Sequence, residues 1–181
     1  MSSRNTIIRS MHDVGLAAWF GGSLMGAVGL NGGTSKATDP TQRLRLSSIG
    51  WGRWAPVQLA AIVVHGIGGA GLIHANKARL AAQPEAMVNT DVKLKLTLVA
   101  AAASLYSGIL GMKIAKHAHE GGEGVTEPSP TASKKLAAVQ RKQKVMQWVI
   151  PLLTGVLLVM GAQQGEQQHP VAGWLHRLTH R

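Results

Sequence analysis

The feature that most constrains this chain is the distribution of its charged residues. Four stretches contain no Lys, Arg, Asp or Glu, while the segments between them are polar and mostly basic. A helix needs roughly 20 apolar residues to cross the hydrocarbon core of a bilayer, with about 17 as the lower limit. All four stretches reach this limit, and they are residues 14–30, 55–75, 96–112 and 145–162.

This pattern predicts an all-α fold, a polytopic integral membrane protein with four transmembrane helices in one domain. We expect the spans at about residues 12–31, 54–76, 92–116 and 136–164. Beyond the fourth span, apolar residues recur at spacings of three and four, with basic residues between them. That spacing predicts a short interfacial helix over residues 170–180.

The net charge points to a membrane environment. Nineteen Lys and Arg residues against eight Asp and Glu give a formal charge of +11, and the charge collects at the ends of the apolar stretches. Basic loops that flank membrane helices favour anionic lipids. Because Phe and Tyr occur once each, the aromatic platforms typical of nucleic-acid binding are missing. We therefore expect the lipid bilayer as a partner, no nucleic acid, and a location in a bacterial plasma membrane.

The stretch "IVVHGIGGAG" at residues 62–71 has two interpretations. Its G-x-G-x-x-G spacing matches a dinucleotide-binding turn, but no alternation of strands and helices follows, as that fold requires. In a membrane helix, small residues instead let neighbouring helices approach closely. The glycines predicted to pack the first two helices together are Gly22, Gly26 and Gly29 in the first and Gly66 and Gly69 in the second.

Two histidines are predicted to lie near one membrane surface. His12 precedes the first span and His74 ends the second, so an antiparallel pair of helices brings them to the same side. Neutral imidazoles can bind the iron of b-type haem or a copper ion, and Met11 adds a sulfur ligand for copper. His12 and His74 are therefore candidate cofactor and metal ligands, with Met11 as a third metal ligand. The alternative is that both histidines face lipid headgroups.

His65 is predicted to lie apart from that surface pair. It is nine residues before His74, which corresponds to about 13 Å along a helix and half a turn around it. An ionisable side chain at this depth usually faces the interior of the bundle and marks a transport path. The alternative is a neutral His65 that hydrogen-bonds a polar residue of the third span, for which the candidates are Ser104, Tyr106 and Ser107.

The start of the first span carries a family resemblance. His12, Trp19, Gly21 and Gly22 form the pattern H-x6-W-x-G-G. This pattern resembles the opening of the CopD-type copper-resistance membrane domain and related small four-helix membrane proteins. The resemblance implies a helical membrane domain with copper or haem bound near His12.

Three functional hypotheses follow, and none of them is an enzyme, because the sequence holds no activated nucleophile, carboxylate pair or phosphate cradle. The first is a membrane protein that binds haem or copper through its histidines in a redox or metal-handling role. The second is an accessory or scaffold subunit of a larger membrane complex, such as a respiratory complex, with no cofactor of its own. It would contact other membrane subunits or form a homo-oligomer. The third is a small transporter or channel that uses His65.

Overall fold

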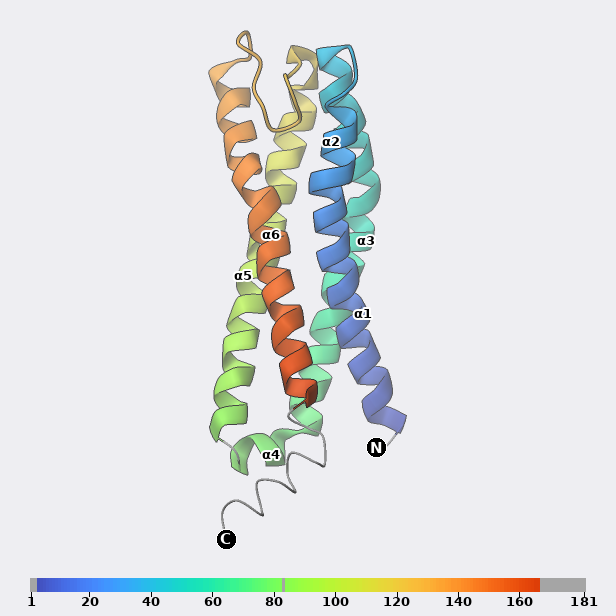
Figure 1. Ribbon diagram of the computed structural model, residues 1–181, viewed down its shortest axis with the longest axis vertical. Coiled ribbons are helices and arrows are strands. Elements are labelled where there is room, and N and C mark those ends of the chain that lie inside the picture. The colour runs from blue at the N-terminus through green and yellow to red at the C-terminus, as the bar shows by residue number, and fades with distance from the viewer. Residues whose placement is uncertain (1–2, 83, 167–181) are drawn as a thin grey trace.

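The computed structural model describes residues 3–82 and 84–166, which form a bundle of four long helices (Figure 1). Neighbouring helices in the sequence run in opposite directions, so the bundle has an up-down-up-down topology. The long helices are α1 (Ser3–Met25), α3 (Pro40–Ala75), α5 (Pro84–Lys116) and α6 (Lys134–Glu166). Short elements join them: the π-helix η1 (Gly26–Leu30), α2 (Asn31–Thr34), α4 (Lys77–Ala82) and the 3-10 helix η2 (Ala118–Glu120). The predicted all-α class is confirmed, and the predicted helix at 170–180 lies outside the described residues.

Four helices are long and apolar enough to cross a membrane, as the sequence predicts. They cover Thr6–Thr34, Pro40–Ala75, Ala86–Lys116 and Lys134–Gln163. The helices extend beyond the predicted spans, most clearly at α3, which begins at Pro40 rather than near residue 54. Asp39 caps this helix, because its carboxylate accepts a hydrogen bond of 2.8 Å from the Thr41 N–H, and Pro40 takes the first helical position.

The bundle carries apolar side chains outside and several polar ones inside. Large apolar residues are exposed on all four long helices, among them Val14, Ile67, Leu98, Leu105, Leu152 and Val159. Polar side chains are buried between the helices, and these include Ser23, Asn31, Ser47, His65, Ser104, Gln140, Gln143 and Thr154. Soluble monomers rarely expose such extensive apolar surface. This distribution is suited to a helical bundle surrounded by lipid.

The interior has two apolar clusters. The larger lies along the middle of the bundle and joins all four long helices through Leu16, Trp19, Ala61, Ala100, Ile150 and Leu157. The smaller lies at the end where α3 and α6 begin and consists of Leu44, Ile114 and Leu136. Between and beside these clusters, the buried polar residues contact one another across helices.

The closest approach of α1 and α3 depends on two glycines that the sequence analysis did not select. A Cβ atom on Gly15 would lie 2.6 Å from the backbone N of His65, and one on Gly68 would lie 2.4 Å from the backbone N of His12. Neither backbone atom can move without shifting its helix. Gly15 and Gly68 therefore set the distance between the two helices at this level.

The predicted glycine surface is correct in part. The ring of Trp54 lies 2.0 Å from the Cβ position of Gly22, and the ring of Trp51 lies 2.1 Å from that of Gly26, so these glycines do pack α1 and η1 against α3. Gly69 is 3.2 Å by the same measure from the His12 ring. The expectation is wrong for the other two. Apart from the neighbouring residues and backbone of its own helix, no described atom lies within 4 Å of the Gly66 Cβ position, and Gly29 meets only the side chain of Met25, four residues earlier. Gly66 fails because the face of α3 toward α1 carries residues 61, 65 and 68, and Gly66 points elsewhere.

The connection between η2 and α6 folds back into the end of the bundle. Arg43 of α3 donates hydrogen bonds to the carbonyl oxygens of Gly122, at 3.2 Å, and Glu123, at 2.9 Å. The Gly122 N–H donates to the Pro40 carbonyl at 3.2 Å, and Val125 and Thr126 are buried. This connection, residues 121–133, closes one end of the bundle (Figure 1).

The capping contacts of Glu120 predict how this closure depends on pH. The Glu120 carboxylate accepts hydrogen bonds from the Ser133 N–H at 2.7 Å and the Ser133 hydroxyl at 3.1 Å, and these bonds hold the pKa of Glu120 below its ordinary value of 4.5. A lowered folded pKa means that this stabilisation is complete above pH 4.5 and is lost as the pH falls through the folded value. We expect the protection factor of the Ser133 amide, its exchange rate relative to an unstructured peptide at the same pH, to fall below pH 4.5. Glu120→Gln should lower this protection factor already at neutral pH, and the control Glu123→Gln should not.

Candidate functional site

His12 and His65 form a stacked pair between α1 and α3. Their ring centroids are 4.0 Å apart and their planes differ by 20°. His65 is 2% exposed, and His12 is half-buried. The sequence places a glycine three residues after each histidine, Gly15 after His12 and Gly68 after His65, and each glycine lies against the other helix's histidine backbone. The two His-x-x-Gly segments thus pack antiparallel, and this close approach lets the two rings stack.

Reciprocal hydrogen bonds fix both rings. His12 Nδ1 lies 3.1 Å from the carbonyl oxygen of His65, and His65 Nδ1 lies 2.9 Å from the carbonyl oxygen of His12. Because a carbonyl oxygen only accepts, the hydrogen in each contact belongs to Nδ1. On each neutral ring, Nε2 is then the unprotonated nitrogen. The pair therefore presents two Nε2 atoms as its bases.

An aromatic ring contacts the pair, and charged groups lie near it. The fully buried Trp19 lies edge-on to His65, with 6.1 Å between ring centroids, and donates its indole N–H to the Ser104 hydroxyl at 3.0 Å. Asp13 and Lys93 lie close enough for their charges to act on both histidines. The site thus combines two stacked imidazoles in a largely apolar bundle with charges of both signs near them, of which Asp13 is exposed.

The arrangement corrects the predicted grouping of the histidines. We expected His12 beside His74 and both apart from His65, but the ring stacked on His12 is that of His65. His74 is exposed near the end of α3. The sequence predicts that the first helix begins near residue 12, which would leave His12 at the membrane surface. In the structure α1 begins at Ser3, so His12 lies farther along the bundle. The alternative of a bond from His65 to the third span is not what the structure shows, because His65 Nδ1 donates to the His12 carbonyl oxygen instead. Tyr106 is 40% exposed.

A haem or copper centre does not fit this pair. Two imidazoles on opposite sides of one iron have ring centres about 6 Å apart, since each ligand nitrogen lies roughly 2 Å from the metal. The stacked rings, at 4.0 Å, are too close. Within residues 3–82 and 84–166, no group of three or more His, Asp or Glu side chains could hold a metal ion. The ligand set of His12, His74 and Met11 stays a prediction.

A second polar group lies near the closed end of the bundle and was missed from the sequence. The Asn31 side-chain oxygen accepts hydrogen bonds from the Ser47 hydroxyl and the Trp51 indole, each at 2.9 Å. Its side-chain nitrogen donates to Gln147 of α6 at 3.0 Å. The π-helix Gly26–Leu30 directly precedes Asn31 and, by widening one turn, changes the direction in which the next residues point. No pattern in the sequence predicts a π-helix at Gly26–Leu30.

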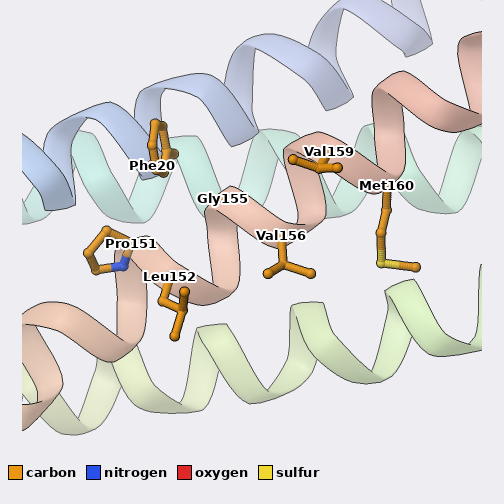
Figure 2. Close-up of a pocket in the computed structure, with 7 residues that line it drawn as sticks. All are labelled: Phe20, Pro151, Leu152, Gly155, Val156, Val159 and Met160. Atoms are coloured by element: carbon orange, nitrogen blue, oxygen red, sulfur yellow. The ribbon is translucent and has the colours of Figure 1, made fainter.

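One apolar groove opens on the outer surface between α1 and α6. Figure 2 shows Phe20 of α1 on one side of the groove and residues of α6 on the other. The groove has a volume of about 420 Å³. It is lined by Phe20, Pro151, Leu152, Gly155, Val156, Val159 and Met160. None of these side chains offers a charge or a hydrogen bond, so the groove is not the place for polar chemistry.

The Trp19 contact gives a testable prediction about the site's packing. Ser104→Ala removes the acceptor of a buried indole N–H, and a buried unsatisfied donor costs about 1–3 kcal/mol. We expect a loss of that size in the free energy of unfolding, followed by tryptophan fluorescence in mixed micelles. Ser10→Ala, at an exposed position of α1, should stay within about 0.5 kcal/mol of wild type.

Comparisons with known proteins assign no family to this geometry. No family model, no curated protein and no solved structure matches the chain. The CopD-type resemblance therefore stays a prediction. Two of its four residues, His12 and Trp19, do lie at the histidine pair.

Proposed function

We propose that this chain is a non-enzymatic integral membrane protein that moves protons across the bilayer, with the His12–His65 pair as the group that accepts and releases the proton. The observation that carries the proposal is the stacked pair itself, two imidazoles whose Nδ1 atoms are committed to backbone carbonyls and whose Nε2 atoms are the bases. The apolar outer surface and four long apolar helices support the membrane location.

Histidine chemistry favours a proton as the cargo. Histidine is the side chain whose charge ordinarily changes between pH 5 and 8, and ionisable groups inside a membrane commonly form proton relays. Two positive charges 4.0 Å apart repel each other by about 4 kcal/mol at an effective dielectric constant of about 20. The pair therefore holds one proton at a time, and the charges of Asp13 and Lys93 act on it with opposite signs.

A purely structural clamp is the competing explanation, and asparagine separates the two. Asparagine can place an amide N–H where His65 Nδ1 lies, so it retains a donor to the His12 carbonyl. It has no counterpart of Nε2 and cannot accept a proton. His65→Asn therefore removes the base while it keeps the contact between α1 and α3.

The test is proton flux into liposomes that contain the purified protein and an enclosed pH-sensitive dye, driven by a potassium diffusion potential. We expect wild type to acidify or alkalinise the lumen faster than empty liposomes, and His65→Asn to fall to the rate of empty liposomes. His74→Asn alters an exposed histidine of the same helix and should conduct as wild type does. A wild type no faster than empty liposomes, or a His65→Asn variant as fast as wild type, contradicts the proposal.

The other functional hypotheses keep separate tests. An accessory or scaffold subunit, in contact with other membrane subunits or a second copy, predicts stable co-purification of a defined partner. Anionic lipid at the basic ends of the helices predicts stronger retention of anionic than of neutral lipid during purification.

A further inference from the structure

Two glutamines of α6 are buried in the polar layer near the closed end, each with one unmet hydrogen-bonding atom. Gln140 is 0% exposed and Gln143 is 8% exposed. In the described part of the chain, the side-chain oxygen Oε1 of each has no hydrogen-bond partner. A buried acceptor without a hydrogen bond costs about 1–3 kcal/mol. A donor other than a described protein group is therefore expected at each of these two oxygens.

The orientation of the Gln140 amide is set by its neighbours. Its Nε2 donates to the carbonyl oxygens of Gly124, at 3.3 Å, and Val125, at 3.1 Å. Turning the amide over would set its oxygen against those two carbonyls. The unmet atom of Gln140 is therefore an oxygen, and its ligand must supply a hydrogen.

Gln143 brings the second oxygen to the same face of α6. Its Nε2 donates to the Ser107 hydroxyl of α5 at 2.8 Å. Residues three apart on a helix share a face and are about 4.5 Å apart along its axis. Both glutamines thus face the interior one turn apart, with an amide oxygen each and with polar groups of α5 and of the 121–133 connection beside them.

We infer that an ordered water molecule binds between Gln140 and Gln143 and donates a hydrogen bond to each Oε1. Buried waters typically make about three hydrogen bonds to polar groups that would otherwise be unsatisfied. Polar side chains make three separate hydrogen bonds within the bundle, from Trp19 to Ser104, from Gln143 to Ser107 and from Gln147 to Thr126. Building on the proposed function, we assign these side chains, joined by water, as the hydrated path between the histidine pair and the closed end.

Water-edited solid-state NMR tests the site directly on the full chain in bilayers. With ¹⁵N-labelled glutamine side chains, we expect rapid magnetisation transfer from water to the amides of Gln140 and Gln143 despite their burial. Gln143→Met keeps the side-chain length, removes the amide oxygen and should abolish the transfer to Gln140. Gln58→Met, on α3, should leave it unchanged. Absence of transfer to both amides in wild type, which needs no variant to fold, overturns the inference, and so does unchanged transfer to Gln140 in Gln143→Met.

The liposome assay separates this inference from the proposed function. If the inference holds, Gln143→Met conducts protons more slowly than wild type while Gln58→Met does not. Flux that depends on His65 but is unaffected by Gln143→Met overturns the path and leaves the proposed function standing. If no flux depends on His65, the proposed function and the path both fail, while water transfer to the glutamine amides still supports the binding site.

Discussion

Gly68→Ala destabilises the bundle by about 3 kcal/mol, the upper end of the usual cost of overpacking, whereas Gly66→Ala, two residues earlier, leaves it unchanged or more stable by up to about 1 kcal/mol. The Gly68 Cβ would lie 2.4 Å from the backbone N and 2.8 Å from the Cα of His12. Only a movement of α1 away from α3 relieves those contacts, and that movement separates the stacked rings. Gly66→Ala meets no described atom within 4 Å and gains helix propensity.

The measurement is the free energy of unfolding of both variants in mixed micelles, by detergent titration with fluorescence detection. Gly15→Ala provides a replicate on the other helix, because its Cβ would lie 2.6 Å from the His65 backbone N. If Gly66→Ala and Gly68→Ala cost the same, Gly68 does not set the distance between α1 and α3 as described.

His65→Ala lowers the free energy of unfolding by about 2–4 kcal/mol, through a cavity and a lost hydrogen bond, while His65→Asn costs clearly less. The alanine variant loses the ring that stacks on His12 and meets Trp19, and it loses the donor to the His12 carbonyl. The asparagine variant keeps the donor and loses part of the packing.

His74→Ala is the matched control, and because His74 is exposed it should change stability by no more than about 0.5 kcal/mol. Equal losses for His65→Ala and His65→Asn in the same detergent titration would show that the Nδ1 contact contributes nothing. If His74→Ala lowered the free energy of unfolding as much as His65→Ala does, the stacking of His65 on His12 would be contradicted.

The four-helix architecture could be predicted from the sequence because the exclusion of charge from long stretches is a local property. Helix ends were harder to predict. Residues 40–53 contain arginines, serines and glycines and are still helical, because Asp39 and Pro40 start α3 early and polar residues do not end a helix. Polarity marks where an apolar span ends, which is a different boundary from the end of the helix.

The histidine pair could have been found from a repeated pattern. His12 and His65 are each followed by a glycine three residues later, and two such segments packed antiparallel place each histidine against the other's glycine. The glycines of "IVVHGIGGAG" indicate a helix-packing surface. Only the register between α1 and α3 decides that Gly68 contacts the neighbouring helix and Gly66 does not. Register depends on contacts between residues far apart in the chain, which periodicity does not reveal.

The polar group around Asn31 illustrates what sequence reasoning could not supply. Asn31, Ser47 and Gln147 come from three segments, and each looks like an ordinary polar residue near a helix end. Their contact depends on the π-helix before Asn31 and on the extra length of α3 before its apolar stretch, which carries Ser47. Neither of these two features can be predicted from the type or spacing of the residues involved.

The most direct test of the central claim is ¹⁵N NMR of the histidine side chains, with the protein in bilayers and the pH lowered in steps. We expect His12 and His65 both to carry hydrogen on Nδ1 and none on Nε2 at high pH. We also expect the pair to take up one proton in total while the bundle remains folded. A hydrogen on Nε2 of either neutral ring at high pH, or two rings that stay neutral until the protein unfolds, would contradict proton uptake by this pair.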